Sequence, residues 1–113
     1  MLVPLNDSEL MIDLAKKLGA KLILVSRNYL GSINHSLLTA ESCRHRGLDV
    51  CGWVFNDKFM NYESDIVSLT GIPAICSIPF IRNISRESVG LEALRVGDRL
   101  TGLLLGAPAR AGE

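Results

Sequence analysis

The sequence predicts an α/β fold built on a parallel sheet, from two patterns and the chain length. Short continuous apolar runs alternate along the chain with segments whose apolar residues recur every three or four positions. Such runs are typical of strands covered on both faces, and their alternation with helices is typical of parallel sheets with right-handed crossovers. The chain has 113 residues, near the commonest size of one domain, so we expect a single core.

Residues that cap helices mark where several elements end. Asp7 or Ser8 can cap the first helix, and Gly19 can end it because glycine adopts a left-handed conformation without a Cβ clash. In order, the sequence predicts a helix over 10–18, a strand over 22–25, a helix from 32 ended by the glycine at 47, a strand over 50–55, a helix over 61–69, a strand over 74–77 and a helix over 88–105.

The apolar residues of two predicted helices mark the faces expected to contact the sheet. In the second helix these residues are Ile33, Leu37, Leu38 and Cys43. In the last helix, which three glycines weaken, they are Leu91, Leu94, Leu100 and Leu104. Residues 106–113 are small and lack periodicity, so we expect a disordered tail there.

Composition excludes several classes of protein. Twelve Lys and Arg balance twelve Asp and Glu, which argues against a nucleic-acid binder with a basic face. No apolar run approaches the roughly 18 residues that span a bilayer, and residues 1–4 do not resemble a secretion signal. Three cysteines without a CxxC pair indicate reduced thiols, so we expect a cytoplasmic protein without membrane or nucleic-acid partners.

Ligands of parallel α/β sheets bind beyond the carboxyl ends of the strands. In this chain that rule selects the loops at 26–32, 56–59 and 78–85. The first loop enters a helix, and the unpaired N–H groups there form a ready anion site near Ser32 and Ile33, with Asn34 as a further donor. The alternative, favoured from the residues alone, is that Gly31 and Ser32 merely cap the helix.

The second loop begins with Asn56, whose side-chain amide offers both a donor and an acceptor to a planar heterocycle. The commoner meaning of Asn56 followed by Asp57 is a turn. Trp53, inside the preceding strand, is expected in the core rather than stacked on a ligand.

The histidines and cysteines give little support to a metal or catalytic site. His35 lies in the first turn of its helix, so we expect it neutral and hydrogen-bonded. Cys43, His45 and Cys51 are close in sequence but fit no zinc spacing. Ser26, Ser32 and Ser36 have no evident base beside them, and no GxxxxGK[ST] phosphate loop occurs.

At these loops the sequence resembles the dethiobiotin synthetases, the ATP-dependent ligases of biotin synthesis. Two segments carry most of the resemblance: Leu-Gly-Ser-Ile-Asn-His at 30–35 and Gly-Trp-Val-Phe-Asn at 52–56. The match also includes Val-Pro-Leu-Asn-Asp at 3–7, Gly-Leu at 47–48 and Ile-Pro at 78–79. It covers roughly residues 2–87 in matching order.

The resemblance implies a three-layer, P-loop NTPase-like fold, of which this chain is the C-terminal half without the phosphate loop. Residues 1–87 would be the C-terminal part of the synthetase-like domain, 88–105 a terminal helix and 106–113 the tail. The family's phosphate loop, catalytic lysine and acidic magnesium ligand have no counterpart here. We therefore expect no catalytic residue and no metal ligand in this chain, and no activity from it alone.

The resemblance also assigns binding residues. Nucleotide contacts fall on Asn56, Asp57, Pro79, Phe80, Ile81 and Glu87. The carboxylate tail of 7,8-diaminononanoate is expected, across the interface of a homodimer, at Gly31, Ser32, Ile33 and Asn34. Some members carry a lysine at the position of Tyr29.

The implied reaction consumes ATP and CO2, requires Mg²⁺ and closes the cyclic urea of dethiobiotin. Two alternatives stay open: a non-catalytic binding or dimerisation module that keeps the half-sheet, and a relative of the cobyrinate amidoligases. Half a sheet also leaves an open strand edge, so we expect the isolated chain to associate.

Overall fold

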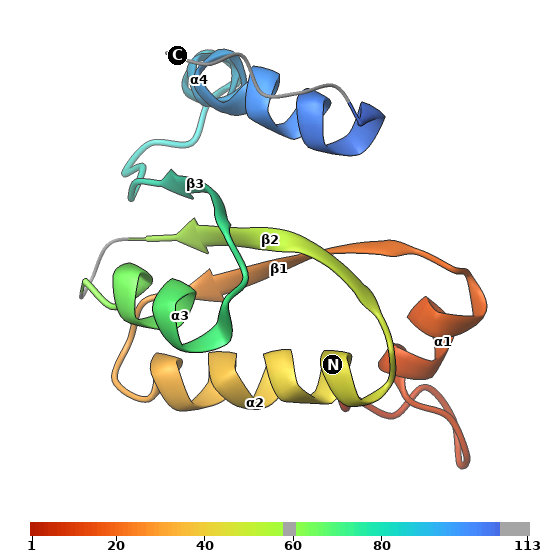
Figure 1. Ribbon diagram of the computed structural model, residues 1–113. Helices are drawn as coiled ribbons and strands as arrows, with labels where there is room; N and C mark the ends of the chain where they lie inside the picture. The colour runs from red at the N-terminus through yellow and green to blue at the C-terminus, as the bar shows by residue number, and fades with distance from the viewer. Residues whose placement is uncertain (58–60, 107–113) are drawn as a thin grey trace.

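The computed structural model describes residues 1–57 and 61–106, and its three strands form one parallel sheet in the order β1-β2-β3 (Figure 1). The α/β fold with a parallel sheet is thereby confirmed. The elements are α1 Met11–Lys17, β1 Lys21–Arg27, α2 Ser32–His45, β2 Asp49–Asn56, α3 Glu63–Thr70, β3 Ala74–Ile78 and α4 Arg86–Leu105.

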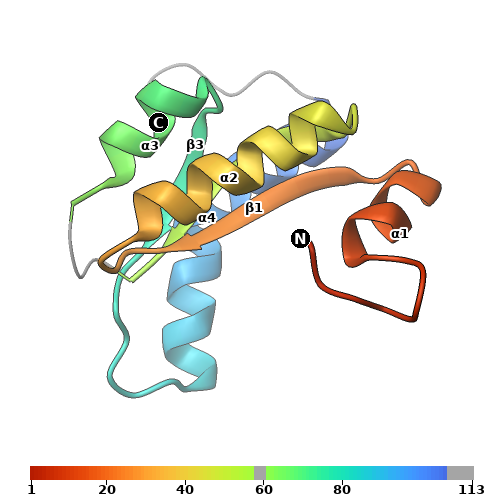
Figure 2. The ribbon, with the colours of Figure 1, turned by 90° about the horizontal axis from the view of Figure 1, so that it is seen from below.

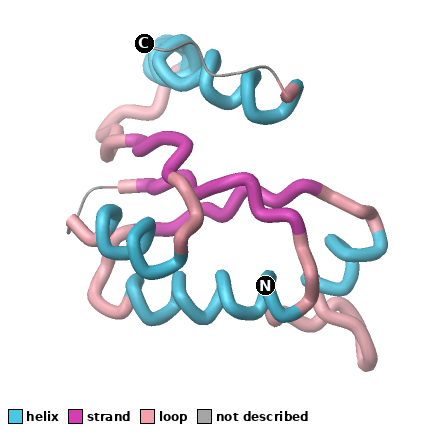
Figure 3. Tube along the Cα trace, in the orientation of Figure 1, coloured by secondary structure: helices cyan, strands magenta, loops and turns pink. Residues whose placement is uncertain are grey.

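The elements form three layers. α2 and α3 cover one face of the sheet, and α4 lies over the other face beside β3 (Figures 1 and 3). α1 lies beyond the start of β1, away from the strand ends that carry the candidate loops (Figure 2). No helix in the described part of the chain is long and apolar enough to cross a membrane.

The larger core lies between the sheet and the layer of α2 and α3. Trp53 and Phe55 of β2 point into it with their rings stacked 6.2 Å apart, which confirms the predicted core position of Trp53. The Trp53 indole N–H donates to the Thr70 hydroxyl at 3.2 Å, so its polar atom is satisfied inside the core. Ile12 and Ile66 complete the most deeply buried part.

α2 buries part of the predicted face: Cys43 lies in the core and Ile33 packs against it, but small residues fill most of the buried positions. Its buried residues are small, at a spacing of three to four: Ser32, Ser36, Ala40 and Cys43. Leu38 is 53% exposed, because it follows Ser36 by two positions and therefore lies about 200° further around the helix. Small residues let α2 lie close to the sheet, where the Ser26 and Ser36 hydroxyls are 2.8 Å apart and hydrogen-bonded.

The first helix begins later than predicted. Asp7 and Ser8 do not cap it; instead the Asn6 side chain accepts the N–H groups of Ser8 and Glu9 and forms a turn before the helix. The Asp13 carboxylate then accepts the N–H of Leu10, at 2.8 Å, and supplies the cap. Gly19 follows the helix with φ +58°, as predicted.

The last helix begins two residues earlier than predicted, and of the four residues predicted to face the sheet Leu100 alone packs against the core there. Ser85 and Ser88 exchange side-chain to backbone hydrogen bonds that set its start. Leu91 and Leu94 are 69% and 82% exposed, and Leu104 is exposed as well, whereas the residues that contact the sheet are Val96, Leu100 and Leu103. Gly106 ends the helix, and the tail predicted beyond it lies outside the described residues from position 107.

The strand register brings the predicted loops to one edge. Arg27 at the end of β1 pairs with Asn56 at the end of β2, and Asn56 pairs with Ile78 at the end of β3. The loops that follow all three strands therefore start side by side.

Candidate functional site

The carboxyl edge of the sheet carries Asn56 and the turn that follows it. Asn56 is exposed, and Asp57 is half-buried with a φ of +74°. Positive φ is uncommon outside glycine, although Asp tolerates it better than most residues. The Asn56–Asp57 pair thus forms the predicted turn, and it does so in a position that presents the Asn56 side chain to solvent.

Three contacts hold Asp57 in this turn. Its N–H donates to the Ile78 carbonyl at 3.0 Å, which ties the turn to β3. Its own carbonyl accepts from the Asn28 side-chain amide at 3.0 Å, which ties it to the loop after β1. Its carboxylate lies 3.6 Å from the Arg27 guanidinium.

A side-chain network beneath the turn joins all three strand ends. Asn28 is 1% exposed, and its amide nitrogen also lies 3.4 Å from the Glu63 carboxylate at the start of α3. The other oxygen of that carboxylate accepts the Ser77 hydroxyl of β3 at 2.5 Å. The Asn28 carbonyl oxygen has no hydrogen-bond partner among the described residues.

No role was predicted from the sequence for Asn28, Glu63 or Ser77. Asn28 carried the same signal as Asn56, a polar amide directly after a buried strand. Glu63 and Ser77 carried none, since an acidic residue at a helix start and a serine in a strand are both common.

The third loop starts beside this turn. Pro79 and Phe80 directly follow β3, and the Phe80 ring is 70% exposed. Ile81 is half-buried. Glu87 is exposed in the first turn of α4, where the positive end of the helix dipole favours a carboxylate.

The start of α2 presents backbone and side-chain hydrogen-bond donors. Gly31 precedes the helix with φ +97°, and the Ser32 N–H is occupied by the Tyr29 carbonyl at 3.0 Å. The N–H groups of Ile33 and Asn34 follow in the first turn, where a helix offers no internal acceptor. The Ser32 hydroxyl is buried and has no partner in the described part of the chain. These donors suit a carboxylate.

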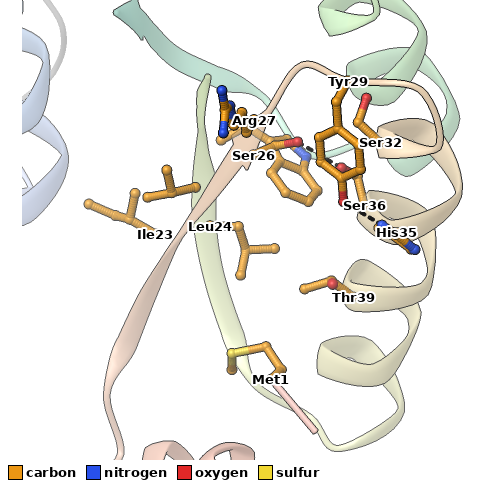
Figure 4. A pocket seen from close by; sticks show the side chains of 12 residues that line it. Met1, Ile23, Leu24, Ser26, Arg27, Tyr29, Ser32, His35, Ser36 and Thr39 are labelled. Carbon is orange, nitrogen blue, oxygen red and sulfur yellow. Dashed lines mark hydrogen bonds between the residues drawn. The ribbon is translucent and has the colours of Figure 1, made fainter. Parts of the chain in front are cut away.

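A pocket of about 290 Å³ lies beside this helix start, between β1 and α2 (Figure 4). Ser26, Arg27, Tyr29 and Ser32 gather at one end of it, and Met1 lies at the other (Figure 4). The Tyr29 hydroxyl is hydrogen-bonded to Nδ1 of His35, so the predicted hydrogen bond of His35 is confirmed. The pocket is polar next to the helix start, and further along it is lined by Leu24, Thr39 and Met1.

Within residues 1–57 and 61–106, no group of three or more His, Cys, Asp and Glu lies close enough to hold a metal ion. Cys43 is fully buried in the larger core, and burial raises the pKa of its thiol. Cys76, under α4, is also buried, and its thiol pKa is raised for the same reason.

Comparison with known proteins agrees with the α/β architecture. The model of a family described as "AAA domain" matches residues 1–88, which include all the candidate residues above. ATP-dependent dethiobiotin synthetase of Cytophaga hutchinsonii is 41% identical over 100 residues, covering 87% of this chain and 48% of the relative. The protein of that name from Neorickettsia sennetsu is 35% identical over 109 residues, covering 92% of this chain and 43% of the relative.

A third relative of the same name, from Chlamydia felis, is 38% identical over 88 residues, covering 78% of this chain and 42% of the relative. The chain thus spans a little under half the length of the curated relatives it matches. The resemblance seen in the two loop segments is confirmed over most of the chain.

Proposed function

The chain belongs to the AAA domain family, and we propose that it forms part of an ATP-dependent dethiobiotin synthetase, in which it binds the adenine of ATP and the carboxylate tail of 7,8-diaminononanoate. The observation that carries this proposal is the strand register. It sets Asn56 directly beside Ile78 and hence beside the loop that begins at Pro79. Residues 1–87 would carry this function, in a cytoplasmic protein.

In the proposed adenine site, the Asn56 amide provides a donor and an acceptor for the edge of the base. Phe80 offers an exposed aromatic ring for its face, and Pro79 and Ile81 offer apolar contacts. Asp57 lies next to Asn56, and Glu87 would add a further polar contact from the start of α4. Such a site discriminates adenine from guanine because their hydrogen-bonding edges differ.

In the proposed tail site, the substrate carboxylate accepts the N–H groups of Ile33 and Asn34 at the positive end of α2. Gly31 lets the chain enter the helix at positive φ, and the buried Ser32 hydroxyl is a further donor. We propose that this site serves the partner subunit of a homodimer.

The remaining chemistry lies outside what these residues can supply. The complete reaction closes the cyclic urea of dethiobiotin from the diamine, CO2 and ATP, and the family requires Mg²⁺ for it. The two carboxylates at this edge do not suit a magnesium ion, because Asp57 faces Arg27 and Glu63 accepts from Asn28 and Ser77. The sequence also has no phosphate loop, so we propose that this chain alone does not catalyse the reaction.

Titration of the 113-residue chain with ATP, followed by NMR, tests the adenine site. ATP should shift the amide signals of Asn56 and Asp57, GTP should shift them less, and Asn56→Ala should weaken ATP binding about tenfold. Asn6→Ala, a change at an exposed asparagine before α1 and away from the strand ends, is the matched control. Equal effects of ATP and GTP, or an unchanged ATP affinity in Asn56→Ala, would contradict the proposed adenine site at Asn56.

Titration with 7,8-diaminononanoate and with its uncharged tail carboxamide tests the tail site. The acid should bind more tightly than the carboxamide, because only the carboxylate gains from the helix dipole. Asn34→Ala should weaken binding of the acid through loss of the side-chain donor. Equal binding of acid and carboxamide would contradict an anion site at Gly31–Asn34.

A further inference from the structure

The Asn56–Asp57 turn needs support from the rest of the molecule. Asp57 is the single non-glycine residue with positive φ among the described residues. A residue in this conformation keeps it only where surrounding contacts hold it. The backbone of the same turn sets the direction of the Asn56 Cα–Cβ bond, so whatever holds Asp57 also helps to place the Asn56 side chain.

Asn28 and Glu63 provide this support from two other elements. The Asn28 amide nitrogen donates to the Asp57 carbonyl at 3.0 Å, and Asn28 is itself almost completely buried. The Glu63 carboxylate accepts from Asn28 at 3.4 Å and from Ser77 at 2.5 Å. Because both partners of the Asn28 amide are acceptors, the nitrogen must face them, and the orientation of the amide is fixed.

We infer that Asn28 and Glu63 are positioning residues that hold the Asn56–Asp57 turn in place for adenine recognition. Glu63 sets the Asn28 amide, and that amide sets the Asp57 carbonyl. The network links the loop after β1, the start of α3 and β3, so the turn is fixed relative to all three strand ends. The inference rests on the proposed adenine site.

Glu63→Gln separates positioning from charge. The glutamine oxygen can accept from Asn28, and its amide nitrogen can donate to the Ser77 hydroxyl, which also accepts. Both hydrogen bonds survive without the negative charge. Glu63→Ala removes both bonds, and Asn28→Ala removes the contact to Asp57 directly. Glu41→Ala, at an exposed glutamate of α2, is the matched control.

Hydrogen exchange of the Asp57 backbone N–H, measured by NMR on the 113-residue chain, tests the positioning step. This N–H donates to Ile78 and should exchange about tenfold faster in Asn28→Ala and Glu63→Ala. Glu63→Gln and Glu41→Ala should match the unsubstituted chain. Exchange of the Phe55 N–H, in the middle of the core, reports whether a variant still folds. Ser77→Ala removes one bond of Glu63 and gives a milder variant for the same comparison.

Titration of the same variants with ATP then links the turn to adenine. Asn28→Ala and Glu63→Ala should weaken ATP binding several-fold, and Glu63→Gln should restore it. If Asp57 exchange stays within about twofold of the unsubstituted chain, or if it rises without any change in ATP affinity, the inference is overturned. If the unsubstituted chain binds no ATP, the proposed adenine site fails, while the exchange rates still decide whether Asn28 and Glu63 hold the turn.

Discussion

The two faces of the sheet are packed to different depths. Under α2 and α3, Trp53, Phe55 and Ile66 form a continuous core in which each is at most 2% exposed. Under α4 the core is smaller, and it centres on Val54 and Val96. Val25, which alternates with Leu24 along β1, is 66% exposed on the α4 side. α4 therefore covers this face of the sheet mainly over β3, and it leaves Val25 near the end of β1 exposed, although Ile23 still packs against the smaller core.

The deeper face also carries the candidate site. α2 and α3 both begin at the carboxyl edge, and their first residues are Ser32 and Glu63. The tail site and the network beneath the Asn56–Asp57 turn are thus anchored to the layer with the larger core. A site needs rigid support, and a deeply packed layer provides more of it than a partly covered one.

The strongest contrast should come from truncation of one core residue on each face. Ile66→Ala, on α3 above the larger core, should lower the free energy of unfolding by about 4–5 kcal/mol, because little can collapse into the space it leaves in a continuous core. Ile75→Ala, at the smaller core under α4, removes the same atoms and should cost only about 2–3 kcal/mol. Urea unfolding followed by Trp53 fluorescence measures both. Equal losses would mean that the two faces are packed alike.

A smaller effect is expected where β2 and β3 approach each other closely. A Cβ at Gly52 would lie 2.7 Å from a side-chain carbon of Ile75 and 2.8 Å from the Pro73 carbonyl oxygen. That oxygen accepts the Trp53 N–H at 2.8 Å and cannot withdraw without loss of the bond. Gly52→Ala should therefore cost about 1–3 kcal/mol in urea unfolding.

Gly97→Ala is the matched control for this change. Gly97 lies within α4, where an added Cβ meets nothing within 4 Å, so alanine should stabilise the helix by about 0.5–1 kcal/mol. If both substitutions destabilise alike, close approach of the strands is not the cause.

The two edges of the sheet also differ in how their outer backbone groups are covered, because side chains of α4 bind the outer carbonyls of β3. Arg95 donates to the Ser77 carbonyl at 2.6 Å and Arg99 to the Ile75 carbonyl at 3.2 Å, so the outer carbonyls of β3 are occupied. An unprotected strand edge is a template for pairing with another chain. The double substitution Arg95→Met and Arg99→Met should cost only about 1 kcal/mol but increase self-association.

Sedimentation velocity at matched concentrations measures this association, with Arg86→Met in the first turn of α4 as the control. The double variant should show larger species than the unsubstituted chain, which we still expect to associate through β1. An identical size distribution would mean that the arginines do not protect the β3 edge.

Much of the fold was predictable because burial leaves a periodic trace in the sequence. The apolar runs at 22–25, 50–55 and 74–77 identified the three strands of the described chain, since strands of parallel sheets are typically apolar on both faces. Their final residues were missed, because strand ends depend on pairing with a neighbour. The faces of two helices were predicted only in part: Cys43 and Leu100 pack as expected, whereas Leu38, Leu91 and Leu94 are exposed. α2 packs small residues against the sheet, and α4 covers one edge rather than a whole face.

The candidate site was predictable only in part. The strand-end rule found Asn56 and Gly31 from local sequence alone. The Asn28–Glu63–Ser77 network could not be found this way, because Asn28 and Glu63 lie 35 positions apart and meet only through the strand order. Polar contacts between distant segments leave no periodic trace.

The finest comparison of the two faces uses the three cysteines. Cys43 is buried under α2, Cys76 is buried under α4, and Cys51 on β2 is half-buried. A thiol-reactive dye should label Cys51 first, then Cys76 as α4 opens locally, and Cys43 last. Burial raises the pKa of the Cys43 and Cys76 thiols, so each holds less of the reactive thiolate at a given pH. The labelling of both should therefore lag further behind that of Cys51 at pH 7 than at pH 9. Mass spectrometry of peptides from timed samples gives each rate. If Cys76 is labelled no faster than Cys43, α4 is held as firmly as α2, and the difference between the faces lies in core size rather than in local stability.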